Sequence, residues 1–476
     1  MFVPPAPGAA QAPPPTLDDE AVDRLLDNER RLDAAFWSGL QDPCPSSPAG
    51  PAVASSPPRQ RAHDSAVPDA ENTLPQPRGL RSPLSELKFA SSGSTRAVIG
   101  GGAALETDVV GECVVLFPGA GGSSVGMGRT LLHVAGVPEL FERASRLVGF
   151  DVLKTCLRGP DELLLQVGGR HAEVCAFVVS LAAMLRLSAE SPQAVRGCVA
   201  AAGYGTGEVA ALVFGGVLSF DDGVRLVKTW ADAVADVVAA DSSARAATGG
   251  GEGGAAAAGG GGGGESGGGG MITLVGLDDA TLAQLVSDGR RALGATQAVK
   301  AAKAGGGSPA AAAAQPGGPA PEAVVSAHLF PRGRSLSGDV ALLEWLLQHA
   351  PERGALFCRR LATTGAFNSP RMARAQASVA ACLAGMPMRP PAFSLYSCVA
   401  GRPYADAEEV RSLLPRQLCE PLLWEESMRH LLGQQQRQQP PRTCYEAGPG
   451  KLLRAMMRRI DMQAWKATRC CADGSE

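Results

Sequence analysis

The fold is decided by the segment Cys198-Val-Ala-Ala-Ala-Gly-Tyr-Gly-Thr-Gly-Glu-Val-Ala-Ala-Leu-Val-Phe-Gly-Gly216. The uninterrupted apolar run 197–202 predicts a strand that is buried on both faces of a parallel sheet. The apolar stretch 208–214 predicts a helix, and the glycines between the two allow a sharp turn. Strand, glycine turn and helix in this order are the context of a nucleophile elbow, Gly-x-Ser-x-Gly, in which a serine stands at the tip of a strained turn. Here both outer glycines are present, but the centre is Gly205.

The glycine motif alone is a weak signal, because Gly-x-Gly-x-Gly also occurs in loops that cradle phosphates. The surrounding pattern adds to it. Residues 113–117 form a second apolar strand that breaks at Pro118-Gly119. Apolar spacing predicts helices through Leu131, Leu132 and Val134, and over 138–148 and 171–187. Strands that alternate with helices predict an α/β fold whose parallel sheet has helices on both faces.

A smaller unit interrupts this pattern. Residues 241–270 are almost entirely Gly, Ala and Ser, and 301–322 add Lys and Pro, so we expect two flexible low-complexity insertions. Strands at 271–276, 323–326, 334–337 and 355–361, with helices at 279–293 and 339–347, follow the ferredoxin-like β-α-β-β-α-β order. We therefore expect an α/β-hydrolase-like large subdomain over 111–240 and 362–468, with a ferredoxin-like small subdomain inserted at 271–361.

Composition excludes several function classes. The net charge of −3 gives no electrostatic reason to expect nucleic acid as a partner. No uninterrupted apolar window approaches 18 residues, so no membrane span is predicted. The 12 cysteines are scattered and include no Cys-x-x-Cys pair, which favours buried free thiols over disulfides or a metal site.

The first 110 residues are predicted to be largely disordered because their Pro, Ala and Ser content cannot form a core. A short helical pattern over 17–40 interrupts them. Asp18, Asp19 and Glu20 precede the first arginine, Arg24, although a mitochondrial transit peptide is rich in arginine and poor in acidic residues. The N-terminus therefore gives no direct support for import.

Several segments, in order, resemble the malonyl-CoA:acyl carrier protein transacylase family of mitochondria and bacteria. Residues 117–128 are similar to its Phe-Pro-Gly-Gln-Gly-Ser-Gln run ending in Gly-Met-Gly, and 198–216 to its Gly-His-Ser-Leu-Gly-Glu elbow, with Tyr204 at the histidine as in animal mitochondrial members. The resemblance continues through 365–369, 395–399, 417–424, 446–450 and 462–466. It spans about three-quarters of the chain and implies the family's fold and a mitochondrial location.

The resemblance also implies where the family's catalytic groups would stand. Its nucleophilic serine falls on Gly205, its histidine base on Asn368 and the glutamine beside its oxyanion site on Ala120. Its carboxylate-binding arginine falls on Trp230, and the asparagine that helps to orient the histidine falls on Cys398. Glycine forms no acyl-enzyme and asparagine exchanges no proton near neutral pH. Tryptophan would leave a malonyl carboxylate unpaired.

We therefore expect a pseudoenzyme that binds or scaffolds, with acyl carrier protein or a larger mitochondrial complex such as the mitoribosome as its partner. The alternative is an active acyl or malonyl transferase of type II fatty acid synthesis with altered chemistry. No cofactor or metal is predicted, and a coenzyme A thioester enters only as a possible ligand.

Substitute catalytic groups are weakly supported. Thr206 follows the elbow tip, but we expect its side chain to point away from the tip and no base to stand near it. Cys175 is expected to be a buried structural thiol, and His171 and His328 to be surface or packing residues. The basic residues Arg454, Arg458 and Arg459 either meet an acidic carrier protein or form a solvated helix face.

Overall fold

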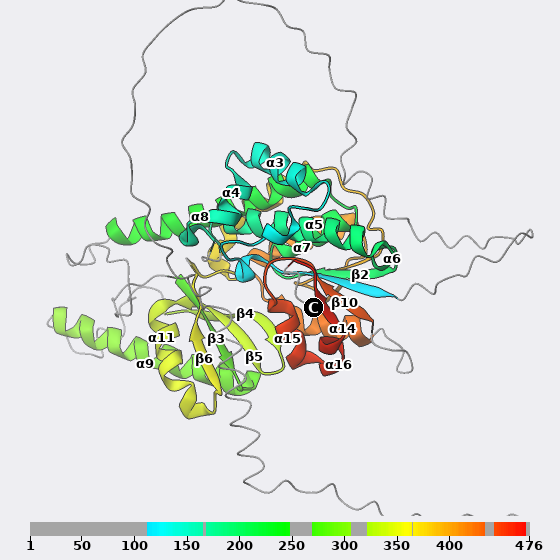
Figure 1. Ribbon diagram of the computed structural model, residues 1–476. Helices are drawn as coiled ribbons and strands as arrows, with labels where there is room; N and C mark the ends of the chain where they lie inside the picture. Colours follow the sequence, from blue (N-terminus) through cyan, green and yellow to red (C-terminus); the bar gives the residue numbers. More distant parts are fainter. Residues whose placement is uncertain are drawn as a thin grey trace, which may run out of the picture. The chain divides into compact units, whose positions relative to one another are not determined.

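The computed structural model describes residues 112–164, 168–247, 269–305, 321–363, 365–433 and 442–472 (Figure 1). The expected N-terminal extension, with its helical pattern at 17–40, lies outside these residues, as does most of both low-complexity insertions. The edges of the insertions differ from expectation. Helix α8 continues to Ala247, strand β3 begins at Gly269 and helix α9 continues to Gly305. Alanine favours helix, so both helices extend into residues that composition assigned to the insertions.

A six-stranded sheet forms the centre of the larger part of the fold. Its order is β11-β10-β1-β2-β7-β8, and all neighbours pair in parallel except the two-residue β8, which is antiparallel to β7. The strands are β1 (Cys113–Phe117), β2 (Cys198–Gly203), β7 (Ser394–Ser397), β8 (Arg402–Pro403), β10 (Thr443–Glu446) and β11 (Thr468–Cys470). Every residue of β1 is buried, as a continuous apolar run in a parallel sheet requires.

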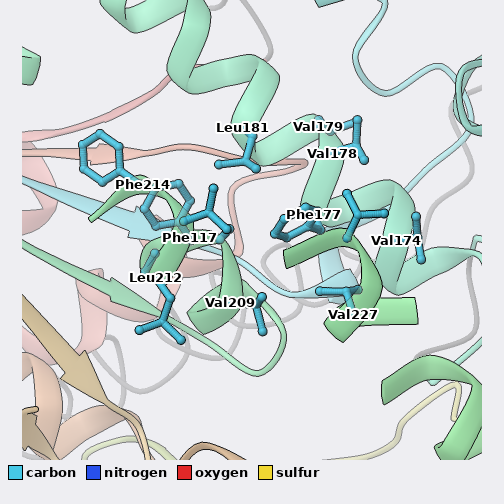
Figure 2. Close-up of a cluster of buried hydrophobic side chains, with 14 of the residues drawn as sticks. Phe117, Val174, Phe177, Val178, Val179, Leu181, Val209, Leu212, Phe214 and Val227 are labelled. Carbon is cyan, nitrogen blue, oxygen red and sulfur yellow. The ribbon is translucent and has the colours of Figure 1, made fainter. Parts of the chain in front are cut away.

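Helices connect these strands. Before the small unit they are α3 (Val137–Val148), α4 (Val152–Arg158), α5 (Ala172–Glu190), α6 (Pro192–Arg196), α7 (Gly207–Phe214) and α8 (Phe220–Ala247). After it come α12 (Ala373–Ala384), α13 (Ala407–Leu413), α14 (Trp424–Gly433), α15 (Leu452–Ile460) and α16 (Met462–Lys466). Figure 2 shows the core that they enclose, in which Phe117 of β1 packs with side chains of α5, α7 and α8 such as Phe177, Leu212 and Val227.

The helix expected through Leu131, Leu132 and Val134 is wrong. The chain there makes only the 3₁₀ turn η2 (Arg129–Leu131) before α3 begins. Gly128 and Gly136 on either side have φ of 79° and 87°, a left-handed conformation that interrupts a right-handed helix. Apolar spacing correctly predicted that Leu131 and Val134 are buried. It gave no information on the two glycines, whose backbone conformation ends the helical path.

Helix α5 is long and apolar enough to cross a membrane by length and composition, with a mean hydropathy of 1.7 over 18 residues. No such helix was expected, because polar side chains such as Ser180 and Arg186 interrupt its apolar run. Inside the protein 83% of that window is buried. This burial is typical of a core helix, and it is the only such helix among the residues that the structure describes.

The small unit confirms the ferredoxin-like prediction. Its elements are β3 (Gly269–Val275), α9 (Asp279–Gly305), β4 (Ala323–Phe330), β5 (Gly333–Asp339), α11 (Val340–His349) and β6 (Phe357–Arg360). The sheet order is β6-β3-β5-β4-β9 with antiparallel pairing among the first four, and α9 and α11 pack together beside it (Figure 1). The added strand β9 (Leu422–Leu423) pairs in parallel with β4 and comes from a distant part of the chain.

The remaining short elements are 3₁₀ turns. They are η1 (Ala120–Gly122), η3 (Asp161–Leu163), η4 (Pro351–Arg353), η5 (Pro370–Met372) and η6 (Leu414–Leu418). Of these, η1 and η6 lie next to the elbow between β2 and α7 and help to build the candidate site.

Candidate active site

The elbow has the geometry that its glycines predict. A Cβ on Gly203 would stand 2.1 Å from the backbone nitrogen of Glu208, and one on Gly207 would stand 2.1 Å from the carbonyl oxygen of Phe117. Both positions therefore exclude any larger residue, because backbone atoms cannot yield as a flexible side chain does. Gly205 at the tip has φ of 60°, and no heavy atom lies within 4 Å of the place where its Cβ would be. The tip therefore has a left-handed backbone, which glycine adopts readily, and it carries no side chain.

Glu208, in the first turn of α7, joins the elbow to the far end of β7. It is 1% exposed, and its carboxyl accepts hydrogen bonds from the Gln417 side chain at 2.5 Å, the Cys398 amide at 3.1 Å and the Tyr404 hydroxyl. Burial raises the pKa of Glu208 to about 8, against the opposing effect of these hydrogen bonds. A large share of this carboxyl is therefore protonated at neutral pH.

Asn368 and Cys398 reach the elbow through the same polar network. The Asn368 Nδ2 donates to the backbone carbonyl of Gln417 at 2.6 Å, and the Gln417 side chain donates to Glu208. The Cys398 thiol donates to the carbonyl of Gly203 at 2.8 Å. Asn368 has φ of 52°, a left-handed conformation that asparagine tolerates better than most residues. Because a carbonyl oxygen needs a donor, this hydrogen bond assigns Nδ2 and leaves Oδ1 as an acceptor.

Ala120 lies on the other side of the elbow, in η1. A Cβ on the preceding Gly119 would stand 2.8 Å from the Tyr204 carbonyl, so this loop packs directly against the turn. The Ala120 methyl is buried against Ala172 and Ala176 of α5. These contacts place the loop amides beside the elbow, which is where an oxyanion-binding loop stands in proteins built on this motif.

Glu173, which the sequence analysis did not single out, connects that loop to the elbow. It is 7% exposed, and it accepts hydrogen bonds from the Gly168 amide at 3.2 Å and from the Thr206 hydroxyl. Burial raises its pKa, and the hydrogen bonds from Thr206, Gly168 and the Ala120 amide oppose that rise. No base beside Thr206 was evident in the sequence, and the structure places the Glu173 carboxyl there. The available signal was an acidic residue at the start of an otherwise apolar helix.

Trp230 is the candidate residue that the structure does not bring into these networks. It lies on α8, is 6% exposed and belongs to the main hydrophobic cluster. Among the described residues, no hydrogen bond or ring contact joins it to the elbow. Its assignment to the family's arginine position therefore stays a prediction, while Gly205, Ala120, Asn368 and Cys398 lie around one turn.

The remaining candidates lie elsewhere. The Cys175 thiol is within 4.0 Å of the Val152 carbonyl on α4, and its pKa is raised by its hydrogen bond with Cys156 and by burial. His171 precedes α5 with its ring 4.4 Å from that of Phe150. His328 Nδ1 on β4 lies 2.6 Å from a carboxylate oxygen of Glu426 on α14. Helix α14 directly follows β9, the strand that pairs with β4.

Within the described ranges, no group of three or more His, Cys, Asp or Glu side chains is arranged to hold a metal ion. The cysteines in the same residues carry free thiols. What the elbow offers chemically is backbone amides and buried neutral or protonated polar groups. The tip has no atom that could form a covalent bond to an acyl group, because Gly205 has no side chain.

A parallel sheet with a strand–glycine–helix elbow and an inserted ferredoxin-like unit defines the class of α/β acyltransferase folds. The chain is 32% identical over 351 residues to the probable mitochondrial malonyl-CoA-acyl carrier protein transacylase of Drosophila melanogaster, covering 74% of this chain and 80% of the relative. It is 31% identical over 369 residues to the human mitochondrial enzyme, covering 77% and 81%. The chain therefore belongs to the malonyl-CoA:acyl carrier protein transacylase family, as its motifs predicted.

Solved structures show the same fold. A malonyl-CoA-acyl carrier protein transacylase from Coxiella burnetii has a TM-score of 0.58 at 20% identity, covering 76% of this chain and 94% of that one. A malonyl-transacylase solved in complex with its type II polyketide acyl-carrier protein has a TM-score of 0.56 at 20% identity, covering 77% and 96%. No family model matches the chain.

Proposed function

We propose that this chain is a non-catalytic member of its family that binds the acyl carrier protein, or the pantetheine arm of that protein or of coenzyme A, without forming an acyl-enzyme. The observation that carries the proposal is the empty tip: the backbone of the elbow is intact, and Gly205 at its centre offers no nucleophile. The cleft that holds a thioester in this family would then serve for recognition alone.

Asn368 supports the same proposal. Its amide makes the hydrogen bond to the Gln417 carbonyl that would orient a catalytic imidazole at this position, but it has no group that titrates near neutral pH. The position could therefore orient a catalytic base, but the asparagine side chain cannot act as one. Loss of one member of such a catalytic set already costs on the order of 10⁶ in turnover.

The named relatives support a location and a partner. The Drosophila and human relatives are named as a probable mitochondrial malonyl-CoA-acyl carrier protein transacylase and as a mitochondrial malonyl-CoA-acyl carrier protein transacylase, respectively. We extend this to the chain as a proposal: a mitochondrial protein whose partner is an acyl carrier protein, alone or within a larger mitochondrial assembly such as the mitoribosome.

One observation favours an alternative, an active transferase with a relocated nucleophile. The Thr206 hydroxyl donates to Glu173, whose raised pKa suits a general base better than an ordinary carboxylate. Against it, Thr206 is 4% exposed and its hydroxyl is committed to α5, so a thioester has little access to it. We therefore favour the non-catalytic proposal.

Intact-mass measurement after incubation with malonyl-CoA or acetyl-CoA tests the choice. The expected result is an unchanged mass, because no exposed nucleophile stands at the elbow. An acyl adduct on the wild-type chain that disappears in Thr206→Val would establish the relocated nucleophile instead. An adduct that persists in Thr206→Val would overturn both versions, since some third residue would then carry the acyl group.

A further inference from the structure

Glu173 stands in the first turn of α5 and receives hydrogen bonds from three separate segments of the chain. Its Oε1 accepts the amide hydrogen of Gly168, in the turn before α5, at 3.2 Å. Its Oε2 accepts the hydroxyl hydrogen of Thr206, the residue after the elbow tip. The amide of Ala120, the first residue of η1, also donates to this carboxyl. Three donors therefore converge on one side chain that is 7% exposed.

Among the residues that the structure describes, no basic side chain forms an ion pair with this carboxyl. Arg170, three residues before Glu173, pairs instead with Asp232 and Asp236 of α8 at 2.7 and 2.5 Å. Burial raises the pKa of Glu173, and its three hydrogen bonds offset that effect only in part. A buried carboxyl without a cation costs free energy. The stability of the fold therefore does not account for an acid at the start of an otherwise apolar helix.

Two of the three donors come from the segments that form the oxyanion site of a nucleophile elbow. In that motif the acyl carbonyl oxygen is bound by the backbone amide of the residue after the tip and by an amide from a neighbouring loop. Here the residue is Thr206 and the loop is η1. A Cβ on Gly119 would stand 3.7 Å from Thr206 Oγ1 and 3.8 Å from its backbone nitrogen, so the loop and the elbow are in contact. Glu173 binds both segments and takes the Ala120 amide hydrogen.

This occupancy affects an acylated ligand and a free thiol differently. The carbonyl oxygen of a thioester would either find the Ala120 amide already bonded or displace Glu173, which would leave a buried carboxyl short of a donor. Either result lowers affinity. A free thiol has no carbonyl and needs neither donor. At the tip itself no heavy atom lies within 4 Å of the Cβ position of Gly205, so nothing there obstructs a thiol.

We propose that Glu173 is a specificity-determining residue that occupies the oxyanion site from within, so that the elbow accepts a pantetheine arm ending in a free thiol and disfavours the acylated arm. The inference rests on the proposed function and names the form of the arm that is bound. It applies to the arm of coenzyme A and to that of a carrier protein, because both end in the same thiol. The chain would then recognise a carrier before its acyl group is loaded or after it has been removed.

The test is a calorimetric titration of the full chain with coenzyme A and with acetyl-CoA. The two ligands differ only by a small neutral acyl group, so the result does not depend on whether Trp230 can receive a malonyl carboxylate. The wild-type chain is expected to bind coenzyme A about tenfold more tightly, because the thioester carbonyl lacks its hydrogen bonds. The same titration with a holo carrier protein and its acetylated form shows whether the preference holds for the arm of a carrier.

Substitutions at residue 173 separate occupancy of the oxyanion site from a structural role. Glu173→Ala removes both oxygens and frees the Ala120 amide, so the preference for coenzyme A should fall to about twofold or less. Glu173→Gln keeps the volume and one acceptor oxygen, so it should retain most of the preference. A merely structural role would weaken both ligands together and leave their ratio unchanged. Glu190→Ala, at the other end of α5 where the carboxylate pairs with Arg186 at 2.8 Å, is the matched control and should change neither affinity.

The outcomes separate this inference from the proposed function. If the wild-type chain binds coenzyme A and acetyl-CoA equally, or if Glu173→Ala leaves their ratio unchanged, the role of Glu173 is wrong while the proposed function stands. The wild-type comparison needs no variant, so it decides the matter even if Glu173→Ala does not fold. If the wild-type chain binds neither ligand and neither form of the carrier, the proposed function is wrong and this inference falls with it. Tighter binding of acetyl-CoA than of coenzyme A would show that the oxyanion site is open.

Discussion

The outer and central glycines of the elbow are the same residue type in opposite surroundings. A Cβ added to Gly203 or Gly207 would stand 2.1 Å from a backbone atom, whereas a Cβ on Gly205 would meet nothing within 4 Å. The outer two are required by packing between β2, α7 and β1, which any chain with this fold must satisfy. The central one is not required by packing, although its φ of 60° is a left-handed conformation that favours glycine. The comparison teaches that the shape of a catalytic turn is maintained by the core, independently of the side chain that does the chemistry.

The largest effect is expected from filling an outer position. Gly207→Ala would place a methyl group 2.1 Å from the Phe117 carbonyl, and we expect a loss of about 3 kcal/mol or more, enough to prevent folding of a marginal chain. Chemical denaturation measures it. Gly385→Ala at the end of α12, where nothing lies within 4 Å, is the control and should change stability by less than about 0.5 kcal/mol. Equal stability of the two variants would contradict the conclusion that packing requires glycine at the outer positions of the elbow.

Glu208 offers the next largest effect. Because burial raises its folded pKa from 4.5 to about 8, its contribution to stability is fully present below about pH 4.5 and is lost as pH rises through 8. The size of the pKa shift corresponds to a loss of a few kcal/mol of folding stability as pH rises. Glu208→Gln should remove this loss, so the denaturation midpoint of the variant should vary less between pH 5 and 9 than that of the wild type.

Glu409→Gln is the matched control for that experiment. Hydrogen bonds from Arg402 and the Ala405 amide lower the pKa of Glu409, so its contribution is present above its unfolded pKa and is lost as pH falls through the folded value. Its replacement should therefore alter the acid side of the profile. A Glu208→Gln profile that parallels the wild type from pH 5 to 9 would show that the buried carboxyl does not set this dependence.

A smaller effect is expected at the centre of the elbow. Gly205→Ser fits sterically but requires a left-handed backbone, at a cost of about 1–2 kcal/mol. We expect a folded variant that still forms no acyl adduct by intact mass, because Asn368 and Trp230 are unchanged. Measurable malonyl transfer by this single variant would mean that the site lacks only its nucleophile. The elbow would then have kept most of its catalytic groups as well as its backbone shape.

The smallest effect concerns Asn368, the other left-handed residue at the site. Asn368→Ala loses the hydrogen bond to Gln417 and keeps the strained φ, whereas Asn368→Gly loses the bond and relieves the strain. We expect the alanine variant to be less stable than the glycine variant by about 1 kcal/mol in urea denaturation. If the two are equally stable, the conformation of residue 368 is not under strain.

Much of the architecture could be predicted because the relevant signals are local. The elbow at 198–216, the alternation of strands and helices and the ferredoxin-like order all depend on neighbouring residues. The failures have equally local causes. Left-handed glycines at 128 and 136 prevent the expected helix near Leu131, and alanine-rich edges lengthen α8 and α9 into the predicted insertions.

The candidate site was harder to predict because its contacts join residues that are far apart in the chain. Gly205 and Asn368 could be assigned to the site only because the segments around them resemble the family's motifs. Nothing local linked Glu208 to Gln417, or Glu173 to Thr206, which are 209 and 33 residues apart. Each of these carboxyls looks like an ordinary helix residue in the sequence, and each becomes a buried hydrogen-bonded centre only when the sheet brings its partners together.

The sequence by itself determined that the elbow has three glycines and that its centre cannot form an acyl-enzyme, since both follow from residue identity and backbone chemistry. Only the tertiary structure decided that two of those glycines are indispensable to packing while the third faces open space. It alone also placed Glu173 and Glu208 on either side of the turn. The physical reason is that burial, with its effects on steric contact and on pKa, is a property of the assembled sheet and helices and of no segment taken alone.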